Sequence, residues 1–128
     1  KVTRDYRTIL DDPSVDGLVV ATPDHWHALA TVTACQAGKH VYVEKPISHN
    51  IVEGRLMVTA ARRHHRIVQA GTQRRSSPNI AELTDFIQSG EIGPIHFARA
   101  WITSRRENIG HAADESIPAG VDYDRWLG

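Results

Sequence analysis

The sequence predicts an α/β fold with a parallel β-sheet, followed by the start of a second α+β domain with an antiparallel sheet. Up to Gly71, three short apolar runs rich in β-branched residues alternate with segments of helical character. The first run, residues 17–22, is continuously apolar up to Thr22, which is typical of a strand buried on both faces of a parallel sheet. After Pro94 the pattern becomes an alternation of apolar and other residues, which is typical of an antiparallel strand with one buried face.

The first strand and its flanking helices are bounded by turn residues. Residues 4–10 favour a short helix, which an Asp-Asp-Pro turn ends, and residues 17–22 (GLVVAT) predict the first strand. Asp24 is a natural N-cap for a helix over residues 24–37, because its carboxylate can accept from free backbone N–H groups. Gly38 suits the position after the last turn, where a left-handed backbone is common.

Two further strands enclose the next helix. Residues 40–43 predict the second strand and residues 67–70 the third. Between them, Asn50 followed three residues later by Glu53 has the spacing of a capping box and predicts a helix that ends near residue 65. Its apolar stripe, at helical spacing, consists of Gly54, Met57, Val58 and Ala61.

The remaining chain predicts one helix and one strand of different character. Ser77 and Pro78 suit the N-cap and first position of a helix that Gly90 ends. Residues 95–104 predict the alternating strand. We therefore expect residues 1–75 to form the second half of a sheet domain with βαβ connections, and residues 76–128 to form a linking helix and the start of a second domain.

Composition excludes several classes of function. The chain has 128 residues, 41% of them hydrophobic, with 15 basic and 15 acidic side chains. This balance predicts no nucleic-acid partner, and no apolar run approaches the roughly 18–20 residues of a membrane span. The single cysteine, Cys35, excludes an internal disulfide. We expect a cytoplasmic protein, although an export signal upstream of the sequence stays possible.

Polar clusters follow all three predicted strands. They are residues 22–27 (TPDHWH), 44–46 (EKP) and 71–75 (GTQRR). Ligands of open α/β sheets bind outside the carboxyl ends of the strands, which in a parallel sheet meet at one edge. The sequence therefore predicts a cleft at that edge, lined by a lysine, carboxylates, an imidazole and amides.

The eight histidines raise the question of a metal site. His25 and His27 are two positions apart, so on a helix their side chains point in roughly opposite directions. His64 and His65 lie in the last turn of a predicted helix, where cations favour the helix dipole. We predict no metal site.

Three segments carry a family resemblance: ATPDHWHA, AGKHVYVEKP and VQAGTQRR. Together they resemble the glucose–fructose oxidoreductase, inositol dehydrogenase and MocA (Gfo/Idh/MocA) family of NAD(P)-dependent oxidoreductases. The resemblance runs from Tyr6 to about Arg105, and the closing VDYDRWLG is similar to the segment that leads into the family's second domain. It implies a Rossmann-type nucleotide-binding domain with NAD or NADP as cofactor.

The resemblance also implies roles for residues at the three strand ends. Lys45 would lie at the reacting centre, near the nicotinamide and the substrate. Its ammonium can stabilise the negative charge that develops on a substrate oxygen during hydride transfer. The cofactor-binding set implied in this way is Thr22, Pro23, His27, Glu44, Lys45, Gln73 and Arg74.

Simpler roles stay open for several of these side chains. Lys45 would then be a surface lysine at a strand end, and Arg74 a solvated cation rather than a ligand of phosphate or carboxylate. Glu44 either orients Lys45 through a salt bridge or accepts from neighbouring backbone groups. His27 either lines the cofactor or caps a helix, and Cys35 is expected to be an inert buried thiol.

The resemblance identifies the chain as a central fragment of a longer enzyme. The Gly-rich G-x-G-x-x-G turn is missing, and the family's usual catalytic Asp and His belong to a later helix. We expect hydride transfer between a nicotinamide and a sugar, cyclitol or related polyol, in a homo-oligomer formed through the second-domain sheet. The alternatives are an NAD-dependent glycoside hydrolase that acts by transient oxidation and elimination, and a non-catalytic Rossmann-derived binding module. The piece alone is expected to bind cofactor weakly or not at all and to show no turnover.

Overall fold

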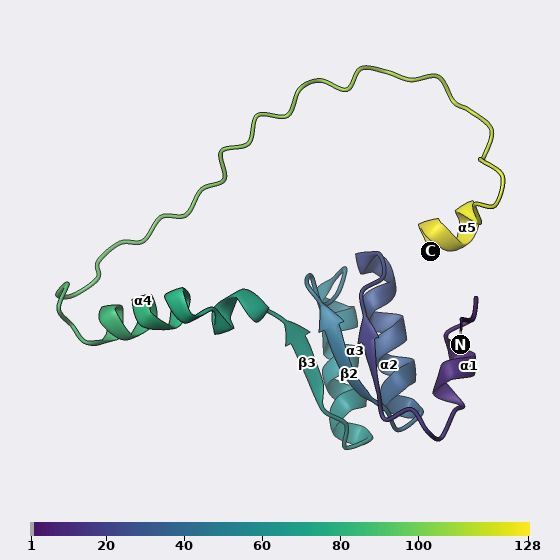
Figure 1. Ribbon diagram of the computed structural model, residues 1–128, viewed down its shortest axis with the longest axis horizontal. Helices are drawn as coiled ribbons and strands as arrows, with labels where there is room; N and C mark the ends of the chain where they lie inside the picture. Colours follow the sequence, from purple (N-terminus) through teal and green to yellow (C-terminus); the bar gives the residue numbers. More distant parts are fainter. Residues whose placement is uncertain (1) are drawn as a thin grey trace. The chain divides into compact units, whose positions relative to one another are not determined.

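Three strands form the parallel sheet that the sequence predicts (Figure 1). They are β1 (Gly17–Val20), β2 (His40–Glu44) and β3 (Val68–Gly71), in the order β1-β2-β3. Val20 of β1 pairs with Val43 of β2, which pairs with Ala70 of β3. Both pairs of strands are parallel, so the three carboxyl ends lie at the same edge of the sheet.

The computed structural model describes residues 2–128. These residues form two compact units, which divide along the chain between Gln73 and Arg74. The first unit contains the sheet, and the second extends from Arg74 to Leu127. Among the described residues, no helix combines the length and the apolar character needed to cross a membrane.

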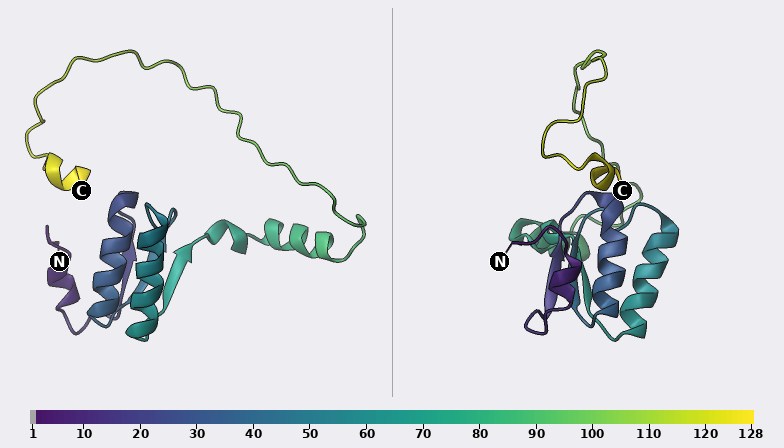
Figure 2. Two further views of the ribbon diagram at one scale, coloured as in Figure 1. Left: turned by 180° about the vertical axis from the view of Figure 1, so that it is seen from behind. Right: turned by 90° about the vertical axis from the view of Figure 1, so that its right-hand side faces the viewer.

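Two helices cover one face of the sheet. Helix α2 (His27–Gln36) connects β1 with β2, and α3 (Ile51–Arg63) connects β2 with β3. The two helices pack side by side, and α2 also packs against β1 and β2 (Figure 2). The core lies between α2, α3 and the sheet, and its buried members include Val20, Ala34, Cys35, Val41, Val43 and Met57.

The opposite face of the sheet is open within the described part of the first unit. Val19 is 75% exposed, Gln69 is exposed, and Tyr42 between them is half-buried. The prediction of strands buried on both faces is therefore wrong for this unit, because both helices that follow the strands lie on one side. The apolar side chain of Val19 does not pack into a core here.

Two predicted helix boundaries are confirmed. The Asn50 side chain accepts from the Glu53 N–H at 2.9 Å, which caps the start of α3. The Glu53 carboxylate accepts from the His49 N–H rather than from the N–H of the cap residue. Gly38 adopts a φ of +77°, and the N–H of Lys39 donates to the Ala34 carbonyl, so the chain leaves α2 through a left-handed turn.

The start of α2 differs from the prediction. A 3₁₀ turn, η1 (Asp24–Trp26), comes first, and α2 begins at His27. Asp24 does not cap the helix, because its carboxylate accepts from the adjacent His25 N–H at 3.0 Å. The first helix, α1 (Arg7–Leu10), is also shorter than the predicted span of residues 4–10.

The second unit is described by itself. Its elements are the 3₁₀ turn η2 (Gln73–Ser76), which begins at the last residue of the first unit, α4 (Pro78–Gln88) and α5 (Tyr123–Leu127). Helix α4 begins at Pro78 as predicted, and no side chain of it is buried. Residues 95–104 form no strand, so this prediction is wrong. A strand with one buried face needs a partner strand, and none of the described residues supplies one.

Candidate functional site

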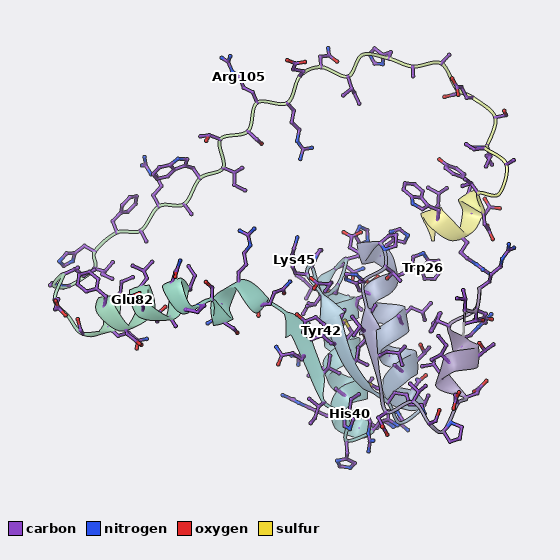
Figure 3. All side chains as sticks on the ribbon, in the orientation of Figure 1. Trp26, His40, Tyr42, Lys45, Glu82 and Arg105 are labelled. Atoms are coloured by element: carbon purple, nitrogen blue, oxygen red, sulfur yellow. The ribbon has the colours of Figure 1, made fainter. Side chains whose placement is uncertain are left out.

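The polar clusters that follow β1, β2 and β3 lie at one edge of the sheet, as the topology requires. Figure 3 shows Lys45 beyond the carboxyl end of β2, whereas His40 lies at the opposite end of the same strand. Trp26 of η1 lies at the same edge as Lys45 (Figure 3). This edge is where an open parallel sheet binds its ligands.

A cleft of about 360 Å³ opens at this edge, and we call it the strand-end cleft. Its lining contains four of the predicted residues, Thr22, His27, Glu44 and Lys45, and the structure brings them together. Asp24 also lines the cleft, as a member of the predicted polar cluster of residues 22–27, although the predicted cofactor-binding set did not include it. The complete lining consists of Ala21, Thr22, Asp24, His27, Glu44, Lys45 and Pro46.

His27 is the most buried side chain of the lining, with 2% exposure. Its Nδ1 lies 2.6 Å from the carbonyl oxygen of Pro46, and its Nε2 lies 2.9 Å from the carbonyl oxygen of Thr22. Both ring nitrogens are therefore engaged by backbone groups. The Lys45–Pro46 peptide bond between the last cleft residues is cis.

Glu44 takes the second of the two roles left open for it. One of its carboxylate oxygens accepts from the backbone N–H of Lys45 at 3.2 Å. The other accepts from the side-chain amide of Gln73 at 3.3 Å, and the Gln73 carbonyl in turn accepts from the Tyr42 hydroxyl at 3.2 Å. Among residues 2–128 no ion pair joins Glu44 to the Lys45 ammonium.

Gly71 at the end of β3 leaves room for this carboxylate. A Cβ atom at Gly71 would lie 2.9 Å from Oε2 of Glu44 and 3.0 Å from its Cα, closer than ordinary contact. The glycine is therefore required by close approach of two strands rather than by a turn. It lets the Glu44 side chain lie between β2 and the segment after β3.

The other predicted residues are placed differently. Pro23 is not part of the cleft lining, and Gln73 reaches the site only through Glu44 and Tyr42. Arg74, the first residue of the second unit, is not part of the cleft lining. In the described part of the chain, no three His, Cys, Asp or Glu side chains are grouped as metal ligands.

The donor set of the strand-end cleft fits the nicotinamide end of a dinucleotide. It offers the exposed ammonium of Lys45, the carboxylate of Asp24 and the side chain of Thr22, which can bind hydroxyl and amide groups. The sequence contains no G-x-G-x-x-G turn for the pyrophosphate.

Comparisons with known proteins agree with this geometry. The sequence profile of the Gfo/Idh/MocA oxidoreductase family, described as having an NAD-binding Rossmann fold, matches residues 1–72. An uncharacterized oxidoreductase, YrbE, of Bacillus subtilis is 33% identical over 99% of this chain and 34% of its own length. Myo-inositol 2-dehydrogenase of Thermotoga maritima is 30% identical over 100% of this chain and 35% of its own length.

Solved structures give the same result. A levoglucosan dehydrogenase in complex with NADH and levoglucosan superposes with a TM-score of 0.66 and 34% identity, covering 71% of this chain and 25% of that one. The chain spans about a third of the length of the curated relatives it matches. On the family match to more than half of its residues, the chain belongs to the Gfo/Idh/MocA family of oxidoreductases with an NAD-binding Rossmann fold.

Proposed function

We propose that this chain forms the nicotinamide side of the active site in an NAD(P)-dependent oxidoreductase that acts on a sugar, cyclitol or related polyol. The observation that carries the proposal is the position of Lys45, which lines the cleft beyond the carboxyl end of β2. Relatives named as inositol and levoglucosan dehydrogenases support the class of substrate. Residues 1–75 would belong to the nucleotide-binding domain and residues 76–128 to the link and the start of a substrate domain.

The cofactor would supply the hydride acceptor when it is bound. Lys45 would then donate a hydrogen bond to the substrate oxygen and stabilise the charge that develops as the hydroxyl proton leaves. Among residues 2–128 its ammonium has no hydrogen bond or ion pair, so it is available for a ligand. The Glu44 carboxylate accepts hydrogen bonds from the Gln73 side chain and from the Lys45 N–H. Through the second of these bonds it would hold the backbone of Lys45 in place.

The proposal is tested on the full-length polypeptide that contains this chain. Purified protein is mixed with NAD⁺ or NADP⁺ and myo-inositol, scyllo-inositol or levoglucosan, and the formation of reduced cofactor is followed by absorbance. We expect turnover with at least one of these compounds, and a fall in kcat of at least about 100-fold in Lys45→Met. Lys39→Met is the matched control, because Lys39 donates to the Asp12 carbonyl and does not line the cleft.

Two results would contradict the proposal. Release of a cleaved sugar from a glycoside with no net reduced cofactor would indicate hydrolysis by transient oxidation instead. Full activity of Lys45→Met would remove this lysine from the reacting centre.

A further inference from the structure

The two loops that carry the strand-end cleft are joined by one side chain. The first loop follows β1 and contributes the carbonyl oxygen of Thr22, and the second follows β2 and contributes the carbonyl oxygen of Pro46. The ring of His27 lies between them, with one nitrogen 2.6 Å from Pro46 and the other 2.9 Å from Thr22.

The chemistry of these contacts requires the ring to donate. A carbonyl oxygen only accepts hydrogen bonds, so each ring nitrogen that binds one must carry a hydrogen. A doubly protonated ring can donate hydrogen bonds to both carbonyls, whereas a neutral ring can donate to one carbonyl at a time. His27 is 2% exposed, so its ring nitrogens are shielded from water and depend on these two carbonyls for hydrogen bonds.

The backbone around His27 favours this use of the side chain. His27 is the first residue of α2, a helix whose buried face packs against β1 and β2, so its Cα is held by the core. Pro46 has no N–H and cannot bind the first loop through its own amide. The residue before it is Lys45, whose ammonium is the reactive group in the proposed function.

We propose that His27 is a positioning residue that ties the Pro46 carbonyl to the Thr22 carbonyl and thereby fixes the backbone of Lys45 at the cleft. His27 acts through these two carbonyls and not as a group that binds the cofactor with its ring nitrogens. This inference rests on the proposed function for what Lys45 does, but the tie between the two loops is independent of it.

Hydrogen exchange measured by mass spectrometry tests the tie directly on the full-length polypeptide. His27→Phe keeps an aromatic ring and removes both donors, whereas His27→Gln keeps an N–H donor. Met57→Ala is the control, because Met57 is a buried core residue of α3 that does not line the cleft.

In His27→Phe we expect the amides of residues 45 and 47–49 to exchange at least about 10-fold faster than in the wild type, while the core strands keep their protection. Met57→Ala should show no selective effect on this segment, and His27→Gln should lie between wild type and His27→Phe. Equal exchange of residues 45 and 47–49 in His27→Phe and Met57→Ala would overturn the tie. If His27→Phe does not fold, the exchange of this segment in His27→Gln is compared with that in Met57→Ala. Faster exchange in His27→Gln supports the tie, and equal exchange overturns it.

Turnover per folded molecule tests the positioning of Lys45. We expect kcat to fall about 10- to 100-fold in His27→Phe, because small displacements of a reacting group have effects of this size, and to stay near the wild-type value in Met57→Ala. A kcat in His27→Phe equal to that of Met57→Ala would overturn the positioning role. If the wild type shows no nicotinamide-dependent turnover, the proposed function fails, while the exchange measurement still decides whether His27 joins the loops.

Discussion

The side-chain amide of Gln73 lies 3.3 Å from the carboxylate of Glu44 and joins the segment after β3 to the end of β2. The Gln73 carbonyl also accepts from the Tyr42 hydroxyl, so one side chain contacts two residues of β2. The neighbouring carboxylate oxygen of Glu44 accepts from the Lys45 N–H. The position of Glu44 next to Lys45 therefore depends on a residue 29 positions later in the chain.

Gln73→Leu removes both hydrogen bonds and should lower the free energy of unfolding by about 0.5–1.5 kcal/mol, toward the lower end because these groups are exposed. Urea unfolding followed by circular dichroism measures this change. Gln36→Leu, at an exposed position at the end of α2, is the control and should change stability less. Equal effects of the two substitutions would show that the Gln73 bridge contributes nothing to stability.

Gly71→Ala should destabilise the first unit by about 1–3 kcal/mol, because the added Cβ would lie 3.0 Å from the Cα of Glu44, an atom of the backbone. Gly54→Ala is the matched control inside α3, where the nearest atom is the Ser48 hydroxyl oxygen at 3.1 Å. A flexible side chain can move, and alanine favours a helix over glycine by about 1 kcal/mol. In thermal unfolding, Gly71→Ala should therefore lower the Tm, whereas Gly54→Ala should lower the Tm less or raise it.

Asn50→Ala should lower the free energy of unfolding by about 0.5–2 kcal/mol, because it leaves the Glu53 N–H without its cap at the start of α3. Asn79→Ala, in the first turn of the exposed helix α4, serves as the control. Chemical unfolding compares the two variants. A loss for Asn50→Ala no larger than that for Asn79→Ala would argue against the cap.

Cys35 should be unreactive in the folded protein. The residue has 0% exposure, and burial raises the pKa of its thiol above the ordinary value of 9.0. The thiolate is the reactive form, so a thiol-specific disulfide reagent should label Cys35 at neutral pH only after unfolding. Fast labelling of the native protein would contradict the burial of this side chain.

The same pKa shift fixes the sign of a pH effect on stability. The unfolded chain loses the thiol proton at a lower pH than the folded chain, so the unfolded state binds fewer protons above about pH 9. The contribution of Cys35 to stability is therefore present below this pH and declines as the pH rises through the folded-state pKa. Cys35→Ala should flatten this decline in urea unfolding measured across the alkaline range.

Local sequence patterns predicted the features that depend on neighbouring residues. The apolar runs located β1, β2 and β3, and Gly38 and Asn50 marked the boundaries of α2 and α3. Residues 95–104 have the alternation of a strand, but a strand forms only where a partner accepts and donates its backbone hydrogen bonds. The pattern describes one face of the segment and carries no information on its partner.

The candidate site shows the same division. Its location at the carboxyl ends of the strands, and the presence there of Lys45 and Glu44, followed from the order of strands and helices. The contact between His27 and Pro46 did not, because it joins positions 19 residues apart whose approach is set by the packing of α2. The sequence also did not show that Asp24 lies in a 3₁₀ turn instead of capping α2, because this depends on the backbone conformation before the helix.

The buried face of α2 is built from small side chains. Besides His27 it consists of Ala28, Ala30, Thr31, Ala34 and Cys35. Ala34 is 0% exposed, so a valine there could enter only by displacing α2 from the elements packed against it. Because His27 is the first residue of that rigid helix, its ring would shift with the axis, and an engineer could adjust the width of the cleft from Ala34 without replacing any residue that lines it.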